Sequence, residues 1–145
     1  KIQVAVDDTV MISKLIDGTF PDYGRVIPTG NNNRVELKRT DLAEAASRVA
    51  TVSSERGRGM KLTFDSDRLS LSVTNPDSGD AEEDLEIPYS APRLEIGFNS
   101  KYLSEILGVL VGDSVTAELS DPGSPTIFHM GAPEEHLIVL MPMRV

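Results

Sequence analysis

Two histidines and two glutamates near the C-terminus are the side chains best suited to metal or acid–base chemistry. His129 and His136 are seven positions apart, on either side of the turn MGAPEE, so a hairpin would let the two imidazoles face each other. Glu134 or Glu135 would then supply a third ligand. No HExxH motif is present, and surface turns often carry His and Glu. We therefore predict no metal site, and a hydrolase that uses His129 and His136 stays only as an alternative.

Other catalytic and ligand-binding patterns are missing from the sequence. There is no GxSxG or SxxK motif around the serines, and the absence of cysteine excludes thiolate chemistry and disulfides. The glycines of ERGRGM (55–60) lack the GxxxxGK spacing of a phosphate-binding loop. The acidic run DSGDAEEDLE (77–86) lacks the alternating ligands of a calcium-binding EF-hand loop. We predict a non-catalytic protein without a cofactor.

Length, charge and hydropathy narrow the class of protein. A chain of 145 residues is long enough for one domain with a real apolar core. A net charge of −9 argues against a free-standing nucleic-acid binder, which normally carries a basic patch. No apolar run is long enough for a membrane span, no signal peptide is recognisable, and a cysteine-free chain suits a reducing cytoplasm. Because the sequence opens without Met on a strand-like run, we expect a soluble fragment of a longer protein.

The charges are distributed unevenly along the chain. Residues 34–61 hold seven of the fourteen Lys and Arg residues, and 77–86 holds six acidic residues. Such runs are usually solvated loops, and that interpretation stays open for both. The alternative is a pair of oppositely charged edges, which would suit head-to-tail association into a closed ring.

Hydrophobic periodicity predicts an alternation of strands and helices. A hairpin is expected at 2–6 and 9–13 around Asp7-Asp8, and the Gly-, Pro- and Asn-rich segment 17–33 is expected to be a linker. Two helices are expected, one at 40–54 capped by Asp41 with Glu44, and one at 100–110 capped by Asn99 or Ser100. The predicted strands after the linker lie at 34–39, 60–65, 68–74, 85–90, 93–99, 114–120, 126–130 and 136–141.

The order strand, helix and three strands thus occurs twice, starting near Val35 and Leu94. One such βαβββ unit would expose a sheet edge and an apolar helix face, and pairing two units covers both. We therefore predict an α+β fold, with two helices packed side by side on one face of antiparallel sheets.

The C-terminal segment HLIVLMPMRV (136–145) raises a separate question, because chain ends usually fray. Five consecutive apolar residues fit a strand, but Pro142 cannot donate to a sheet and should mark its end. Two flexible methionines and an arginine then lie beyond the sheet. This composition is more typical of a binding surface than of a core.

Several separated motifs resemble one family. SKLIDGTFPDYGRVIP (13–28), GFN followed by Tyr102 (97–102), NP followed by acids and EIPYS (75–90), and the terminal VLMPMRV are similar to bacterial β sliding clamps, the processivity subunits of the replicative DNA polymerase. The resemblance implies the DNA-clamp fold, with three domains per subunit and two subunits closed head-to-tail around duplex DNA. Residues 1–23 would be the last strands of the second domain with a linker, and 24–145 the third domain.

The resemblance also implies a function and its partners. The family is non-catalytic and tethers the DNA polymerase III alpha subunit, the clamp loader and repair proteins through short linear peptides with a Gln and two apolar residues. The competing hypothesis is a stand-alone β-rich ligand-binding module without a DNA role, but the chain has no Trp and only three Tyr for an aromatic platform.

Site residues can be carried over position by position. The implied peptide-binding pocket is lined by Pro21, Arg25, Val26, Asn99, Tyr102, Val139, Leu140, Met141, Pro142, Met143 and Arg144. The implied DNA-facing cations are Arg48, Arg56, Arg58 and Lys101. The implied dimer interface, an acidic edge with the end of the first helix, comprises Thr51, Val52, Asp77, Asp80, Glu82 and Glu83.

Overall fold

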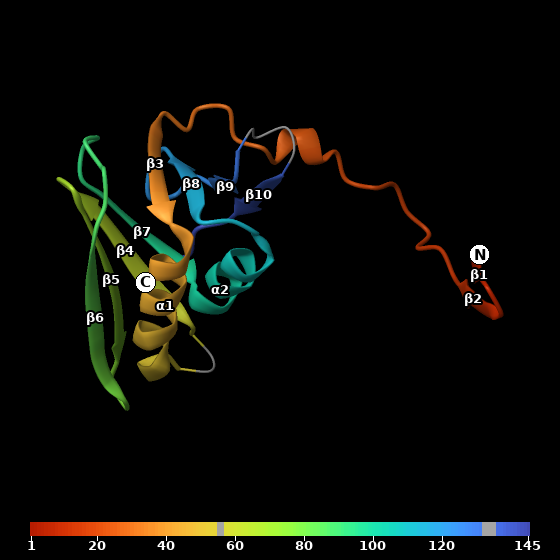
Figure 1. The fold of residues 1–145 in the computed structure, drawn as a ribbon, viewed down its shortest axis with the longest axis horizontal. Helices are drawn as coiled ribbons and strands as arrows, with labels where there is room; N and C mark the ends of the chain where they lie inside the picture. Colours follow the sequence, from red (N-terminus) through yellow and green to blue (C-terminus); the bar gives the residue numbers. More distant parts are fainter. Residues whose placement is uncertain (55–56, 132–135) are drawn as a thin grey trace.

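The computed structural model describes residues 1–54, 57–131 and 136–145. At its start, β1 (Ile2–Val6) and β2 (Thr9–Ser13) form the predicted antiparallel hairpin, with Asp7 in a left-handed turn conformation at φ 49°. Every residue of the hairpin is exposed, and Figure 1 shows it at the far end of an extended segment, away from the other strands. The predicted linker follows, and its one regular element is the 3-10 turn η1 (Tyr23–Arg25).

The other eight strands form two four-stranded antiparallel sheets. One sheet has the order β10-β9-β8-β3 and the other has the order β6-β5-β4-β7. The first sheet comprises β3 (Asn33–Lys38), β8 (Ser114–Leu119), β9 (Thr126–His129) and β10 (Leu137–Leu140). The second comprises β4 (Gly59–Asp65), β5 (Arg68–Asn75), β6 (Gly79–Glu86) and β7 (Leu94–Asn99).

The two predicted βαβββ units exchange their first strands. The first strand of the first unit, β3, pairs with β8 of the second unit, and β7 of the second unit pairs with β4 of the first. The helices repeat this exchange, because the Arg39 N–H donates to the Asp113 carbonyl after the second helix (2.9 Å) and the Ser100 N–H donates to the Arg58 carbonyl after the first (2.7 Å). Each unit therefore supplies one strand to the sheet of the other unit.

Two helices, α1 (Arg39–Val49) and α2 (Ser100–Val109), pack against each other. Figure 1 shows them side by side, as predicted, with α1 beside β5 and β6 and α2 beside β7 and β10. Their buried faces include Leu42, Ala45, Leu103 and Leu107. None of the helices in the described part of the chain is long and apolar enough to cross a membrane.

The predicted cap of α1 is wrong, whereas that of α2 is confirmed. The helix α1 starts at Arg39, directly after β3, with Lys38 at the cap position and no side-chain cap. Asp41 instead pairs with the Lys38 ammonium at 3.2 Å. The loop carbonyl of Asp113 accepts the first of the backbone N–H groups that lack a partner within the helix. In α2, the Asn99 side chain accepts from two backbone N–H groups, as predicted.

The acidic run is a strand rather than a loop, which corrects both its interpretation as a solvated loop and the predicted strand at 85–90. All eight residues of β6 pair with β5, and Leu85 lies opposite the buried Leu69. β6 is an edge strand, where charged side chains remain in water and discourage pairing with other chains. Because most residues of β6 are charged, its alternation of exposed and partly buried positions could not be seen as an alternation of polar and apolar residues.

The core lies between the helices and the sheets. Phe98 of β7 and Phe128 of β9 meet with ring centroids 6.2 Å apart and nearly edge-to-face, which joins the two sheets beneath the helices. Alternate residues of the strands, such as Lys61 and Thr63 of β4, are only partly buried and belong to the opposite face of the second sheet. We call this opposite face the outer face.

Candidate functional site

The C-terminal tail (141–145) is anchored to the second sheet. The Met143 backbone N–H donates to the Gly97 carbonyl of β7 at 2.8 Å. A Cβ atom at Gly97 would lie 2.4 Å from the Met143 carbonyl oxygen, and one at Gly59 would lie 2.7 Å from a Val145 methyl. Gly97 therefore permits a close approach of the tail backbone that a side chain would prevent, whereas at Gly59 the Val145 side chain would have to shift. The tail is bound to the sheet rather than frayed.

The start of α2 lies next to the anchored tail, because Asn99 ends the strand that holds it. The Asn99 Oδ1 accepts from the backbone N–H groups of Lys101 (3.0 Å) and Tyr102 (3.4 Å), which fixes the first turn of the helix. Tyr102 is 54% exposed and Met141 is 59% exposed. Two large apolar side chains are thus presented to solvent by rigid elements.

The remaining predicted pocket residues of the tail differ in exposure. Val139, Pro142 and Met143 are half-buried, and Arg144 is exposed. Leu140 is only 6% exposed and belongs to the core, so its side chain is not available at the surface. Leu140 shares the core-facing side of β10 with Ile138, which also packs against the core.

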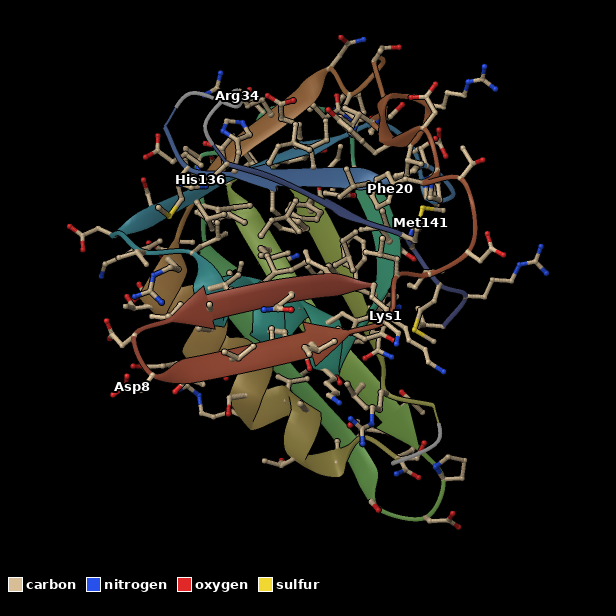
Figure 2. The ribbon with its side chains drawn as sticks, turned by 90° about the vertical axis from the view of Figure 1, so that its right-hand side faces the viewer. Lys1, Asp8, Phe20, Arg34, His136 and Met141 are labelled. Atoms are coloured by element: carbon tan, nitrogen blue, oxygen red, sulfur yellow. The ribbon has the colours of Figure 1, made fainter. Side chains whose placement is uncertain are left out.

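The linker supplies the other predicted pocket residues. Arg25 is exposed and forms an ion pair with Asp22 at 3.2 Å, and Val26 is exposed as well. Figure 2 shows Phe20 of the linker and Met141 of the tail toward the same side of the molecule. Pro21, next to Phe20, is exposed too. The structure therefore holds the tail at Gly97, on the strand that leads into α2, and leaves these linker residues exposed.

The predicted DNA-facing cations lie on or next to the helices. Lys101 is on α2 with its ammonium 3.6 Å from Glu105, one turn further along. Arg58 has a φ of 46°, and its carbonyl accepts from the first N–H of α2. Arg56 lies outside the described residues. A groove of 320 Å³ between the helix ends is lined by Arg58, Lys101 and several serines.

Arg48 differs from the other predicted DNA-facing residues, because its guanidinium contacts the acidic edge. Its Nε and one Nη lie 3.0 and 2.6 Å from the two carboxylate oxygens of Glu83, and the other Nη lies 3.4 Å from Glu44. The hydrogen bonds from Arg48 hold the pKa of the Glu83 carboxyl below its usual value, and those of Glu83 raise the pKa of Arg48. Arg48, predicted to face DNA, thus binds Glu83, predicted to lie in the dimer interface.

Two of the predicted dimer-interface residues, Val52 and Asp77, are linked by Asn75, a residue that sequence reasoning missed. The buried Asn75 amide donates to the Val52 carbonyl (2.7 Å) and its oxygen accepts from the Asp77 N–H (3.0 Å). Val52 and Thr51 belong to the 3-10 turn η2 (Ala50–Val52) at the end of α1. Asn75 thereby connects the end of α1 to the turn before β6.

The acidic side chains of β6 point to both faces of its sheet. Glu83 lies opposite the buried Leu71 and so shares the helix-facing side, where it reaches Arg48. Asp80 and Glu82 lie opposite Thr74 and Ser72, on the outer face. No sequence pattern indicates which acid would meet which cation, because Arg48 and Glu83 are 35 residues apart.

The two histidines lie in different environments. His129 is fully buried, with Nε2 at 3.2 Å from Glu118 Oε1 and Nδ1 at 3.1 Å from the Gly131 carbonyl. His136 is exposed, and Glu134 and Glu135 lie outside the described residues. Within residues 1–54, 57–131 and 136–145, no cluster of three potential metal ligands occurs.

Comparison with known proteins identifies the family. The family described as "DNA polymerase III beta subunit, C-terminal domain" matches residues 24–144. The chain is 39% identical to the beta sliding clamp of Pseudomonas aeruginosa over 144 residues, and 39% identical to that of Caulobacter vibrioides over 145 residues. These alignments cover 99% and 100% of this chain but only 39% of each relative. The chain thus spans about two fifths of the length of these relatives.

Solved structures agree with the sequence comparison. A crystal structure of a sliding clamp from Bartonella birtlesii bound to griselimycin superposes with a TM-score of 0.93 at 47% identity, covering 99% of this chain and 38% of that one. A Pseudomonas aeruginosa clamp with a ligand gives a TM-score of 0.92 at 38% identity, covering 99% and 39%. The predicted α+β clamp fold is therefore confirmed, and the chain belongs to the DNA polymerase III beta subunit family, the bacterial β sliding clamps, through their C-terminal domain.

Proposed function

We propose that this chain is part of a processivity factor: a ring-shaped clamp that encircles duplex DNA and tethers the replicative polymerase. Residues 1–23 would end the second domain and 24–145 form the third. The observation that carries the proposal is the tail held by the Met143–Gly97 hydrogen bond, with Met141 and Tyr102 both exposed, since a family resemblance alone would not require an anchored tail and exposed apolar side chains here. The ring would act in the cytoplasm.

The tail, the start of α2 and the linker would bind short linear peptides from partner proteins. Tyr102 and Met141 offer exposed apolar area, and the thioether of Met141 can repack around different side chains. The polar groups of Asn99 and Arg144 would orient the bound peptide. The expected partners are the polymerase III alpha subunit, the clamp loader and repair proteins.

The helices would form the DNA-facing wall of the ring. A clamp that slides must contact phosphates without reading sequence, and scattered cations on helices achieve this. Lys101 and Arg58 border the groove between the helix ends, and Arg56 belongs to the same proposed set. Arg48 would contribute less, because its guanidinium is bound to Glu83.

The acidic edge would close the ring against a basic surface of the first domain of a second subunit. Asp77, Asp80 and Glu82 have no ion pair among the described residues, so their charges are available to a partner. The small side chains of Thr51 and Val52 would pack beside them. No catalytic residue, metal or cofactor has a part in this proposal.

A primer-extension assay tests the proposed function. The full-length subunit that contains this chain, with its polymerase and clamp loader, should lengthen the products made on primed single-stranded DNA. A version lacking residues 141–145 should give products as short as those made without the clamp. Full-length products from the truncated subunit would contradict the role of the tail, and short products from the intact subunit would contradict the function.

A further inference from the structure

A second groove lies on the outer face, beyond the peptide pocket proposed above. Its volume is 340 Å³, and it runs along β4 and β5 from the tail to the loop after α1. Met143, Arg144 and Val145 form one side, and the hydroxyl side chains of Ser54, Ser72 and Thr74 lie among the other lining residues. We call it the outer groove.

The charge of the outer groove is opposite to that of the chain. The chain carries a net charge of −9, yet the described residues that line the outer groove include Arg58, Lys61 and Arg144 and no Asp or Glu. Within the described residues, no side-chain carboxylate lies within 4.0 Å of the Lys61 ammonium or the Arg144 guanidinium. Unpaired cations of this kind attract anionic groups.

Three carboxylates lie in neighbouring depressions that Lys61 also borders. Asp65 and Glu82 line a smaller one of 180 Å³ on the β6 side, and Glu95 lines another of 210 Å³ on the β7 side. Among the described residues, none of the three carboxylates lies within ion-pair distance of Lys61. These carboxylates would repel a ligand carboxylate, so its favourable position is at Lys61 and Arg144, inside the outer groove.

The floor of the outer groove is open because two glycines line it. Gly57 and Gly59 have no side chain, and a Cβ at Gly57 would already approach Ser54 Oγ at 3.0 Å. Ser72 lies directly opposite Lys61 in the pairing of β4 with β5, so a hydroxyl and an ammonium stand side by side. Backbone and carboxylate oxygens of an extended peptide would find donors here.

The outer groove is continuous with the peptide pocket through the tail, since Met143 and Arg144 belong to both. We propose that it binds an acidic segment that flanks the apolar residues of a partner peptide, with the carboxylates at Lys61 and Arg144. This proposal rests on the proposed function, because it needs a peptide in the pocket. Duplex DNA is a poorer occupant, because it would contact the helix side, and the outer groove shares only Ser54 and Arg58, at one end, with the groove between the helix ends.

Peptide binding to the full-length subunit tests the proposal. Three fluorescent peptides share a core with one Gln and two apolar residues: the core alone, the core flanked at both ends by three Asp, and the core flanked at both ends by three Ser. Fluorescence anisotropy gives the Kd of each. We expect the Asp-flanked peptide to bind about fivefold more tightly than the Ser-flanked one at low salt, and this advantage to shrink as salt is added.

Substitutions then locate the effect. Lys61→Gln should abolish the advantage of the Asp-flanked peptide and leave the affinity for the core alone unchanged. The matched control is Lys38→Gln, which removes the same charge from the end of β3, where Lys38 pairs with Asp41. The control should retain the full advantage.

Each other outcome overturns a distinct claim. Equal affinities for the Asp- and Ser-flanked peptides would overturn the outer groove as a binding site for acidic segments, as would an equal loss in both lysine variants. Loss of core binding in Lys61→Gln would place Lys61 in the pocket itself and overturn a separate role. If the core peptide failed to bind the unchanged subunit, the proposed function would fail, and this inference with it.

Discussion

The guanidinium of Arg48 binds the carboxylate of Glu83 in a two-point contact, at 3.0 and 2.6 Å, and so connects α1 to the edge strand β6. The side chains are 57% and 27% exposed, so solvent weakens the pair. Its position matters more than its strength, because it holds one acid of the proposed dimer edge within the subunit. The acids available to a second subunit are then those on the outer face and in the turn before β6.

This ion pair predicts a pH-dependent contribution to stability. The pKa of Glu83 is lowered in the folded chain, so the contribution is fully present above the unfolded value of 4.5 and is lost as the pH falls through the lower folded value. Arg48→Ala should therefore lower the free energy of unfolding slightly at pH 7, because the pair is exposed to solvent. Near pH 3 the difference from the unchanged protein should shrink. Urea titrations at both pH values measure it, and an equal difference at both would contradict the role of the ion pair.

Asn75 should matter for stability and for assembly. Asn75→Ala leaves the Val52 carbonyl and the Asp77 N–H without their partner, at a cost of about 1–3 kcal/mol in the free energy of unfolding. Because the same change loosens η2 from the turn before β6, the full-length dimer should also weaken. Urea unfolding and sedimentation equilibrium measure the two effects. Asn32→Ala, on the linker, is the control and should change neither.

Replacing the two histidines should change the free energy of unfolding to very different extents. His129 is fully buried and contacts Glu118 and the Gly131 carbonyl, so His129→Ala should lower the free energy of unfolding by about 2 kcal/mol or more. His136 is exposed, and His136→Ala should stay within about 0.5 kcal/mol of the unchanged chain. Equal effects in thermal or urea unfolding would contradict this assignment. Tight zinc binding that both substitutions abolish would revive the metal site.

Gly97 should be required for the position of the tail. Gly97→Ala places a Cβ 2.4 Å from the Met143 carbonyl oxygen, so the tail must move and peptide affinity should fall roughly tenfold or more. Gly108→Ala is the matched control, because nothing lies within 4 Å of a Cβ there and alanine favours the helix α2 by up to about 1 kcal/mol. Anisotropy with a clamp-binding peptide distinguishes the two variants. Unchanged affinity in Gly97→Ala would show that the anchored position of the tail is unimportant.

The sequence was sufficient where a single local signal determined the structure. The turn at Asp7-Asp8 fixed the first hairpin, Asn99 capped α2, and regular apolar spacing placed both helices. The sequence was insufficient where contacts with residues distant in the chain determined a strand or a helix start. The charges of β6 concealed a strand that pairs with β5, and Asp113 rather than Asp41 satisfies the start of α1.

In the candidate site, too, some features were expected from the sequence and others depend on contacts between distant residues. The exposure of Met141 was expected from its place beyond the last strand, whereas Tyr102 was implied only by the family resemblance. The ion pair of Arg48 with Glu83, the bridge made by Asn75 and the two glycines under the tail all depend on how the two exchanged units meet. No spacing within one strand or helix encodes such contacts.

The central claim is that Tyr102 and the tail form a peptide-binding surface, and one titration tests it most directly. A fluorescent peptide with one Gln and two apolar residues is titrated with the full-length subunit, and with Tyr102→Ala, Met141→Ala and Val111→Ala versions. Val111 is an exposed apolar residue outside the proposed pocket and serves as the control. Saturable binding that weakens roughly tenfold in Tyr102→Ala and Met141→Ala, but not in Val111→Ala, is the predicted result. Binding that all four proteins share equally, or that none shows, would contradict the claim.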